Sequence, residues 1–260
     1  MIAEKYQAFI FDLDGVIILG KEAVPGSVNA VNKLKSMGKQ IRFLTNNASR
    51  KRETIAGLLQ GLGIDTETSE IITSGFATAR YIAKKFGKID VHILGTEELK
   101  EEMRNQGLKI VDRNAQVVAV GLDREFNYSK LDLALQNIIV DGAKFIACNC
   151  DPAFPEKDAT RPGAGAIVAA LSCCANKQPD IIIGKPSLPC YEIVLETLNC
   201  AAKDCLMVGD KIETDLLGGR SAEMATALVL SGIGKHEDTQ RLNFIPEHII
   251  ASVASLLEYR

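Results

Sequence analysis

The chain has 260 residues, enough for one large domain or two smaller ones. Its 47% hydrophobic and 24% charged residues are typical of a soluble globular protein. A formal net charge of −3 argues against a nucleic-acid partner, which usually meets a basic face. No apolar run approaches the roughly 18 residues of a spanning helix, the N-terminus lacks a signal-peptide pattern, and the seven cysteines are scattered. We therefore expect a reduced, cytoplasmic protein without a membrane partner.

A short apolar run at residues 8–11 ends in two acids, Asp12 and Asp14, followed by Gly15. The run predicts a buried strand of a parallel sheet, and ligands of such sheets bind beyond the carboxyl ends of the strands. In an extended segment both carboxylates would lie on one side, where they repel each other unless a cation joins them or one is protonated. A solvated Asp-x-Asp-Gly turn is the alternative interpretation of this stretch taken alone.

Strands and helices alternate in the next part of the chain, which predicts a parallel α/β sheet. Ser27 is the expected N-cap of the first helix, and Gly38 its expected stop. Thr45, Asn46 and Asn47 follow the second strand directly. The other expected elements are a packed loop at 16–20, a strand at 41–44, a helix over 55–62, a strand at 71–75 and a helix at 76–86.

Residues 87–180 form a second set of alternating units, and we expect them to be an inserted domain. The predicted strands are 91–95, 117–122 and 145–149, with helices after Thr96, at 131–140 and at 164–174. Breaker residues at 152–163 predict a long loop. The cysteines here lack the C-x-x-C spacing of zinc sites, and Cys148 and Cys173 are predicted to be small buried or half-buried side chains.

The last part of the chain returns to apolar runs that end in polar residues. The run at 181–183 leads to Lys185, and the run at 205–209 leads to Asp210, with Asp215 shortly after. Helices are expected at 189–198, around Gly218 and at 249–257, with a strand at 225–230. Residues 1–86 and 181–260 are thus predicted to form one core that the insert interrupts.

Four predicted strands end in polar groups, and in one parallel sheet these ends would meet at a single edge. Carboxylates, a lysine, and hydroxyl and amide groups together suit Mg²⁺ and a phosphoryl group. Each group alone has a structural explanation. Thr-Asn-Asn is typical of a cap or Asx turn, Gly-Lys-Pro of a loop, and Asp215 of the first turn of a helix.

These motifs, in this order, resemble those of the haloacid dehalogenase-like (HAD) hydrolase superfamily. The insert resembles that of subclass IIA, the NagD/4-nitrophenylphosphatase-like branch. The resemblance covers nearly the whole chain and implies a Rossmann-like parallel-sheet core with an inserted α/β cap domain. The residues that carry it are Asp12-Leu13-Asp14-Gly15, Leu44 to Ser49, Asn149-x-Asp151, Arg161 to Ala166, Ile183 to Ser187, Gly209-Asp210 and Asp215.

The resemblance implies a Mg²⁺-dependent phosphatase that hydrolyses small phosphomonoesters through an aspartyl-phosphate intermediate. Asp12 would be the nucleophile, and Asp14 would protonate the leaving alcohol and later activate water. Mg²⁺ would be held by the Asp12 side chain, the Asp14 backbone carbonyl and Asp210, and Asp215 would either support these ligands from behind or bind the ion through water. Thr45, Asn46, Asn47 and Lys185 are the implied phosphate ligands.

The insert would close over the site as a cap, and its loop from Asn149 to Pro155 is the candidate for substrate choice. This assigns Asn149, Asp151 and Phe154 to substrate binding. Some pyridoxal-phosphatase relatives place a histidine where Phe154 stands. The expected partner is a small phosphorylated metabolite, and both a monomer and a homodimer are consistent with the sequence.

Two other functions are open on the same scaffold. A phosphotransferase or phosphomutase of this superfamily usually has a small helical cap after the first motif, and about 30 residues between Gly15 and Thr45 leave no room for one. A non-catalytic phosphometabolite-binding protein would be expected to lose Asp12 or Asp210, and both are present. Phosphoglycolate, sugar phosphates and nucleoside monophosphates all remain candidate substrates.

Overall fold

The computed structural model describes residues 1–156 and 159–259, which divide into two compact units. The first unit comprises Met1–Thr45, Arg52–Ile72 and the chain from Tyr191 onward, and the second comprises Asn46–Lys51 and Thr73–Cys190. The borders predicted for an inserted cap, at 87 and 180, follow sequence signals and differ from the borders of these units. The cap assignment therefore remains a prediction.

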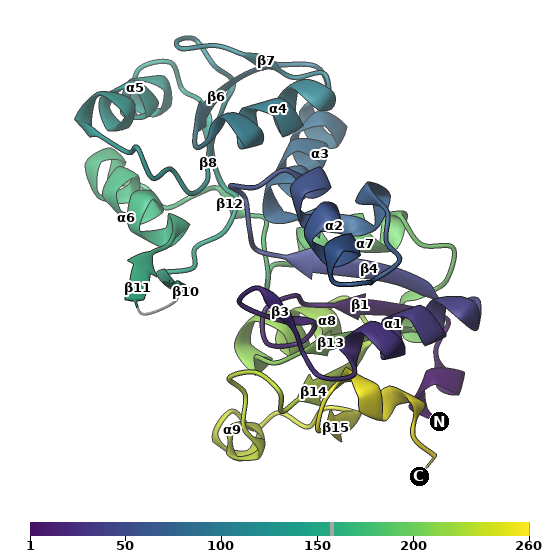
Figure 1. The fold of residues 1–260 in the computed structure, drawn as a ribbon. Helices are drawn as coiled ribbons and strands as arrows, with labels where there is room; N and C mark the ends of the chain where they lie inside the picture. The colour runs from purple at the N-terminus through teal and green to yellow at the C-terminus, as the bar shows by residue number, and fades with distance from the viewer. Residues whose placement is uncertain (157–158, 260) are drawn as a thin grey trace. The chain divides into compact units, whose positions relative to one another are not determined.

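The first unit is built on a six-stranded sheet with the order β15–β14–β13–β1–β4–β5 (Figure 1). β1 is parallel to β13 on one side and to β4 on the other, and β13–β14 and β14–β15 are also parallel pairs. The elements of this unit are η1 (Ile2–Lys5), β1 (Ala8–Phe11), β2 (Ile18–Leu19), β3 (Glu22–Ala23), α1 (Ser27–Ser36), β4 (Gln40–Thr45), α2 (Arg52–Gly61), η2 (Thr68–Glu70), β5 (Ile71–Thr73), η3 (Ala202–Asp204), β13 (Cys205–Gly209), η4 (Ile212–Leu216), α8 (Leu217–Ser221), β14 (Ala225–Val229), α9 (His236–Arg241), β15 (His248–Ile250) and η5 (Val253–Leu257). Helix α7 (Leu188–Glu196) crosses the border between the units.

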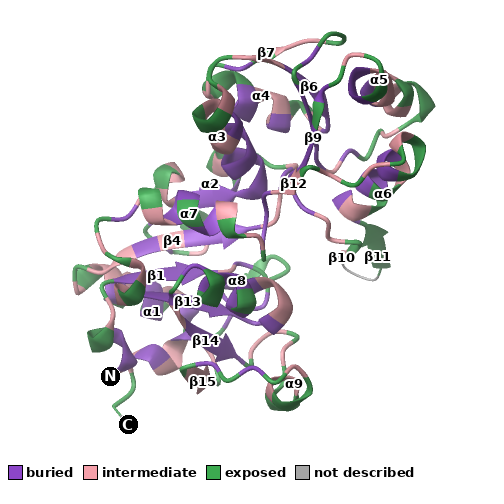
Figure 2. Cartoon of the chain, turned by 180° about the vertical axis from the view of Figure 1, so that it is seen from behind, coloured by how far each residue is buried: buried purple, intermediate pink, exposed green. Residues whose placement is uncertain are grey.

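Burial on both faces explains the unbroken apolar runs of β1 and β13. Every residue of these two strands is buried, as Figure 2 shows in purple. A strand that is covered on both faces has a continuous hydrophobic sequence, whereas a strand covered on one face alternates hydrophobic and polar residues. Phe9 and Phe11 stack with ring centroids 6.1 Å apart, and the ring centroid of Phe43 on β4 lies 6.2 Å from that of Phe11. One packed core therefore holds the strands on which the predicted catalytic residues depend.

Helix α1 begins at Ser27, and its N-cap is Gly26, which has a φ of 80°. The prediction of Ser27 as the N-cap is wrong, because the Ser27 hydroxyl donates to the Ile17 carbonyl at 3.0 Å. Ala30, Val31 and Leu34 form the buried face of the helix at helical spacing. The helix ends shortly before Gly38, as predicted.

The second unit has its own five-stranded sheet, in which every neighbouring pair is parallel, with the order β12–β9–β8–β6–β7. Its elements are α3 (Ser74–Phe86), β6 (Asp90–Leu94), α4 (Glu97–Asn105), β7 (Lys109–Ile110), β8 (Val117–Val120), α5 (Tyr128–Ile139), β9 (Lys144–Ala147), β10 (Ala153–Glu156), β11 (Ala159–Pro162), α6 (Ala164–Ala175) and β12 (Ile181–Ile182). Across both units, the described residues include no helix long and apolar enough to cross a membrane.

The strand that leads to Lys185 does not join the sheet of the other predicted strand ends. β12 pairs with β9, so that Ile181 aligns with Ile146. The expectation that all four strand ends share one sheet edge is therefore wrong for Lys185. Of the four predicted strand ends, those of β1, β4 and β13 share one sheet edge. The prediction failed for β12 because strand pairing depends on contacts between distant segments, which an apolar run of three residues does not specify.

The breaker-rich stretch at 152–163 contains two strands where a loop was expected. β10 and β11 pair antiparallel, with Phe154 opposite Arg161. Proline is tolerated in such a ribbon because both strands are edges. Residues 157 and 158, within the predicted loop, lie outside the described residues.

The C-terminal segment also differs from its prediction. The expected helix at 249–257 is instead the strand β15 followed by the short 3₁₀ helix η5. β15 extends the first sheet beside β14, where Ile250 is buried, and this pairing overrides the helical pattern. The helix α9 and the strand β15 had no counterpart in the sequence analysis.

A π-helical turn, η4, follows the strand β13 and carries Asp215. π-helical turns are rare and frequently occur at functional sites. The hydroxyl of Tyr191, a side chain with no exposed surface, donates to the carbonyls of Thr214 and Asp215, each at 2.9 Å. Tyr191 therefore holds the backbone of this turn from helix α7.

Replacing Tyr191 with Phe should lower the free energy of unfolding by about 1–2 kcal/mol, because the two carbonyls lose the donor that they share. Urea unfolding followed by circular dichroism measures this change. Tyr128→Phe is the matched control, since Tyr128 is 83% exposed, and it should change stability by less than about 0.5 kcal/mol. Equal losses in the two variants would contradict the assigned role of the Tyr191 hydroxyl.

Candidate active site

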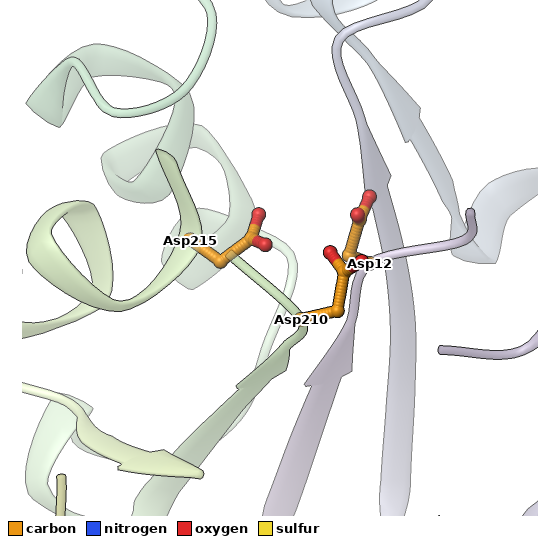
Figure 3. A group of neighbouring side chains, drawn as sticks. All are labelled: Asp12, Asp210 and Asp215. Atoms are coloured by element: carbon orange, nitrogen blue, oxygen red, sulfur yellow. The ribbon is translucent and has the colours of Figure 1, made fainter. Parts of the chain in front are cut away.

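Three predicted site residues of the first unit come together at the ends of two neighbouring strands. Asp12 directly follows β1, Asp210 directly follows β13, and Asp215 lies on η4. The Asp12 amide donates to the Val208 carbonyl at 3.0 Å, which continues the β1–β13 pairing up to the acid. Each side chain offers a carboxylate oxygen within 4.8 Å of the other two, and Figure 3 shows the carboxylates turned toward a common space.

The backbone fixes two of these carboxylates where water has little access. Asp210 is 5% exposed and accepts from the Ile233 amide at 2.9 Å. Asp215 is fully buried and accepts from the Lys211 amide at 3.2 Å. Like charges so close together are costly unless a cation or a proton offsets them. Carboxylate oxygens are the ligands that Mg²⁺, Ca²⁺ and Mn²⁺ prefer, so this donor set fits such an ion.

Gly15 completes the packing around this cluster. Its φ of +81° lies in the left-handed region, and a Cβ at this position would stand 2.4 Å from Oδ2 of Asp210. Any other residue would therefore push the Asp210 carboxylate away. The sequence indicated a turn at Gly15, but the contact with Asp210 follows only from the pairing of β1 with β13.

Asp14 stands apart from the three clustered carboxylates. Asp12 is half-buried, whereas Asp14 is exposed and forms an isolated bridge with Ile18. The predicted role of Asp14 as proton donor needs an accessible side chain, and its exposure is consistent with that role. Thr45 is the last residue of β4 and is buried.

A second set of predicted site residues meets within the second unit. The Asn46 side chain accepts from the Lys185 amide at 2.8 Å and donates to the Lys185 carbonyl at 3.1 Å and to the Asp151 carboxylate at 3.0 Å. Asn149 donates to the Asn46 carbonyl at 2.7 Å and accepts from the Asp151 amide at 3.1 Å. Residues separated by about a hundred positions thus form one hydrogen-bonded group, and the sequence did not indicate that they contact one another.

Asn47 adopts the conformation that the sequence analysis kept as its structural alternative. Its side-chain oxygen accepts from the amides of Ser49 at 2.9 Å and Arg50 at 3.0 Å, which is an Asx-type turn. The turn leads the chain toward helix α2. The role of Asn47 in phosphate binding stays a prediction.

Ser74 is a residue of this group that sequence reasoning missed. Its hydroxyl donates to the Asn46 carbonyl at 2.7 Å and accepts from the Asn149 amide group at 3.4 Å. Ser74 begins helix α3 directly after the strand β5. A hydroxyl at the end of a strand is the signal that could have identified it, since the same signal selected Thr45.

Phe154 lines a cavity of about 430 Å³ in the second unit. The Arg124 guanidinium carbon lies 5.5 Å from the centre of the Phe154 ring. Glu156 pairs with Arg124 at 3.0 Å and with Arg161 at 3.3 Å, and the hydrogen bond from Arg124 lowers the pKa of Glu156. The wall of the cavity thus combines an aromatic ring with charges that are already paired.

Burial disfavours the reactive thiolate form of two cysteines of the second unit, Cys148 and Cys150. Burial raises the pKa of the Cys148 thiol to about 12, so it is a neutral side chain near pH 7. Burial also raises the pKa of the Cys150 thiol. Cys173 is exposed, which corrects the prediction that it is buried or half-buried.

Two family models match most of the chain. Residues 9–109 match a haloacid dehalogenase-like hydrolase family, and residues 182–256 match a HAD-hydrolase-like family. The chain is 33% identical over 257 residues to the 5′-nucleotidase YutF of Bacillus subtilis, which is 98% of each sequence. The two family models cover the segments that contain Asp12, Thr45, Lys185 and Asp210, which are among the motifs on which the resemblance was based.

Solved structures show the same similarity along nearly the whole chain. The p-nitrophenyl phosphatase of Archaeoglobus fulgidus matches with a TM-score of 0.91 at 35% identity, over 96% of this chain and 97% of that one. NagD of Escherichia coli K-12 matches with a TM-score of 0.89 at 30% identity, over 96% and 98% of the two chains. The predicted α/β fold with a parallel-sheet core is confirmed. The chain belongs to the haloacid dehalogenase-like hydrolase superfamily, subclass IIA, and is a phosphatase of its NagD/4-nitrophenylphosphatase-like branch.

Proposed function

We propose that this phosphatase requires Mg²⁺ and hydrolyses small phosphate monoesters through a phosphorylated aspartate. The observation that carries the proposal is the meeting of Asp12, Asp210 and Asp215 within 4.8 Å at the ends of β1 and β13. Such a cluster would destabilise the fold if it had only a structural role, because it gathers negative charge where water is largely excluded. It is suited to a divalent cation that in turn binds a phosphate.

Asp12 is the proposed nucleophile. Its carboxylate oxygen attacks phosphorus, so that a new O–P bond forms while the bond from phosphorus to the alcohol oxygen breaks. Asp14 gives a proton to the departing alcohol and then takes one from the water that hydrolyses the aspartyl phosphate. The half-buried carboxylate of Asp12 and the exposed one of Asp14 support this division of roles.

The remaining residues offset charge and position the phosphate. Asp210 and Asp215, together with the Asp12 carboxylate and the Asp14 carbonyl, would hold Mg²⁺, which supplies electrostatic stabilisation of the phosphoryl oxygens when bound. Lys185 is the proposed cation for the phosphate, with Thr45 and Asn47 as further donors. Catalysis then depends mostly on placement and charge.

The substrate is proposed at the level of a small phosphorylated metabolite. Two of the relatives named above are a 5′-nucleotidase and a p-nitrophenyl phosphatase, and their substrates differ in the alcohol that is released on hydrolysis. The cavity of about 430 Å³ beside Phe154 is of a size that accepts small molecules. We assign Phe154 to the choice among them, and we retain the cytoplasmic location and a monomeric or homodimeric state as parts of the proposal.

Replacing Asp12 with Asn should lower the turnover of p-nitrophenyl phosphate by about 10³-fold or more, because the amide is a poor nucleophile. Phosphate release and circular dichroism together distinguish loss of chemistry from loss of the fold. Asp65→Asn, the same change at an exposed carboxylate, is the control and should leave turnover unchanged. Substantial turnover by a folded Asp12→Asn protein would exclude Asp12 as the nucleophile.

Chelation of divalent ions should abolish phosphate release, and added Mg²⁺ should restore it. Asp210→Asn should raise the Mg²⁺ concentration needed for half-maximal activity about 10- to 100-fold. Binding can be followed without turnover, because an ion that binds only the folded state raises the melting temperature. Full activity in the presence of a chelator, with no thermal effect of Mg²⁺, would rule out the metal assignment.

Phe154→His should change kcat/KM for some phosphate monoesters by about tenfold or more relative to others, because it alters both the shape and the polarity of the cavity wall. A panel of sugar phosphates, nucleoside monophosphates and phosphoglycolate measures the effect. Tyr128→His changes an exposed aromatic residue outside the cavity lining and serves as the control. Equal changes for all substrates would count against a role in specificity.

A further inference from the structure

The Asn46 side chain pairs with the backbone of one residue, Lys185, from both of its ends. Its oxygen accepts from the Lys185 amide at 2.8 Å, and its nitrogen donates to the Lys185 carbonyl at 3.1 Å. A backbone amide can only donate and a carbonyl can only accept, so this pairing also fixes which end of the side chain is oxygen. The arrangement is a two-point attachment like that between neighbouring strands.

The second hydrogen of the Asn46 nitrogen goes to the Asp151 carboxylate at 3.0 Å. An amide nitrogen has two hydrogens, and both are therefore used within the protein. The Asn46 side chain could donate to a phosphate oxygen only by giving up one of these bonds. Its geometry thus favours a role toward Lys185 over direct contact with the substrate.

Asn149 and Ser74 hold the backbone of Asn46 at its carbonyl. Both donate to the Asn46 carbonyl, each at 2.7 Å. Asn149 is only 4% exposed, and its oxygen accepts from the Asp151 amide at 3.1 Å. A side chain this buried has almost no surface to offer a substrate, although the sequence assigned it to substrate binding.

Gly184 allows Asn46 to come this close. A Cβ on Gly184 would stand 2.6 Å from the Asn46 side-chain oxygen and 2.6 Å from the Cys148 carbonyl. The residue before Lys185 must therefore lack a side chain if the pairing is to form. Gly184 is therefore required for the pairing between Asn46 and Lys185.

We propose that Asn46, Ser74, Asn149 and Asp151 form a hydrogen-bonded clamp that fixes the backbone of Lys185, and that they are positioning residues rather than contacts of the substrate. This inference rests on the proposed function, in which Lys185 is the cation for the phosphate. Lys185 is 5% exposed, and its long side chain places charge accurately only if its backbone is held. The clamp supplies that restraint from three distant parts of the chain.

A double-mutant cycle with Asn46→Ala and Lys185→Ala tests the clamp. In the wild-type background Asn46→Ala should lower kcat for p-nitrophenyl phosphate about 10- to 100-fold, since displacing a charge by about 1 Å costs that much. In the Lys185→Ala background the same change should lower kcat less than about threefold, because residues that act through one another are not additive. Inorganic phosphate titrated against the melting temperature of all four proteins gives a second readout that needs no turnover.

Asn32→Ala is the matched control for loss of a two-point amide attachment. The Asn32 side chain also donates to a carbonyl, that of Gly63 at 2.8 Å, and accepts from an amide, that of Asp65 at 3.0 Å. It should lower the melting temperature without changing kcat. Should Asn46→Ala fail to fold, Asp151→Ala replaces it in the cycle, and Asp151→Asn, which keeps an acceptor for Asn46, should recover part of the lost kcat.

The outcomes separate this inference from the proposed function. If Asn46→Ala is equally damaging with and without Lys185, or if Asp151→Asn is no better than Asp151→Ala, the residues act on the substrate directly and the clamp is overturned. If the wild-type protein releases phosphate from no substrate and inorganic phosphate does not raise its melting temperature, the proposed function fails, and the clamp loses its purpose with it. An active enzyme with a non-additive cycle supports both.

Discussion

Mutual repulsion among Asp12, Asp210 and Asp215 is the constraint on which the first unit depends. Three carboxylates with oxygens within 4.8 Å of one another oppose folding, because burial weakens the screening that water provides. The burial of every residue of β1 and β13 beneath them offsets this cost. Strands held this firmly resist the separation of their acidic ends, and a bound cation would relieve the repulsion that remains. The firm packing of β1 and β13 would thus support the cation site that we propose at their ends.

Backbone amides, a buried hydroxyl and a glycine together position this cluster. The Ile233 and Lys211 amides each fix one carboxylate, the Tyr191 hydroxyl holds the turn that carries Asp215, and Gly15 leaves the space that Asp210 fills. Backbone donors have no rotamers to order, so they position charge at little cost in entropy. Carboxylates arranged in advance bind an ion more tightly than mobile ones, because the ordering has been completed during folding.

How far the sequence predicts this protein depends on whether a feature is local. The apolar runs before Asp12, Thr45 and Asp210 correctly predict buried strands. Their common sheet edge also follows from sequence, because the carboxyl ends of parallel strands lie at one edge. Lys185 looked equivalent, yet its strand belongs to the second sheet, because an apolar run of three residues does not specify its neighbour. For the same reason, the sequence could not predict that Asn46, Asn149 and Asp151 form one hydrogen-bonded group. Each residue alone is typical of a turn, and only long-range pairing makes them contacts of one another.

The same distinction separates residues that touch a substrate from residues that act through others. The family resemblance implied that Asn46 binds phosphate, and the position of Asn149 and Asp151 in the predicted cap loop assigned them to substrate binding. The hydrogen bonds place most of their polar atoms within the protein, and Asn149 has almost no exposed surface. A variant at any of them can therefore mimic a defect in substrate binding while its cause is a displaced Lys185. Under our proposal, substrate choice falls to groups with open surface, and in the described part of the second unit the cavity wall around Phe154 and Arg124 offers such a surface. Separate groups for charge placement and for substrate choice would let relatives with different substrates keep one catalytic arrangement.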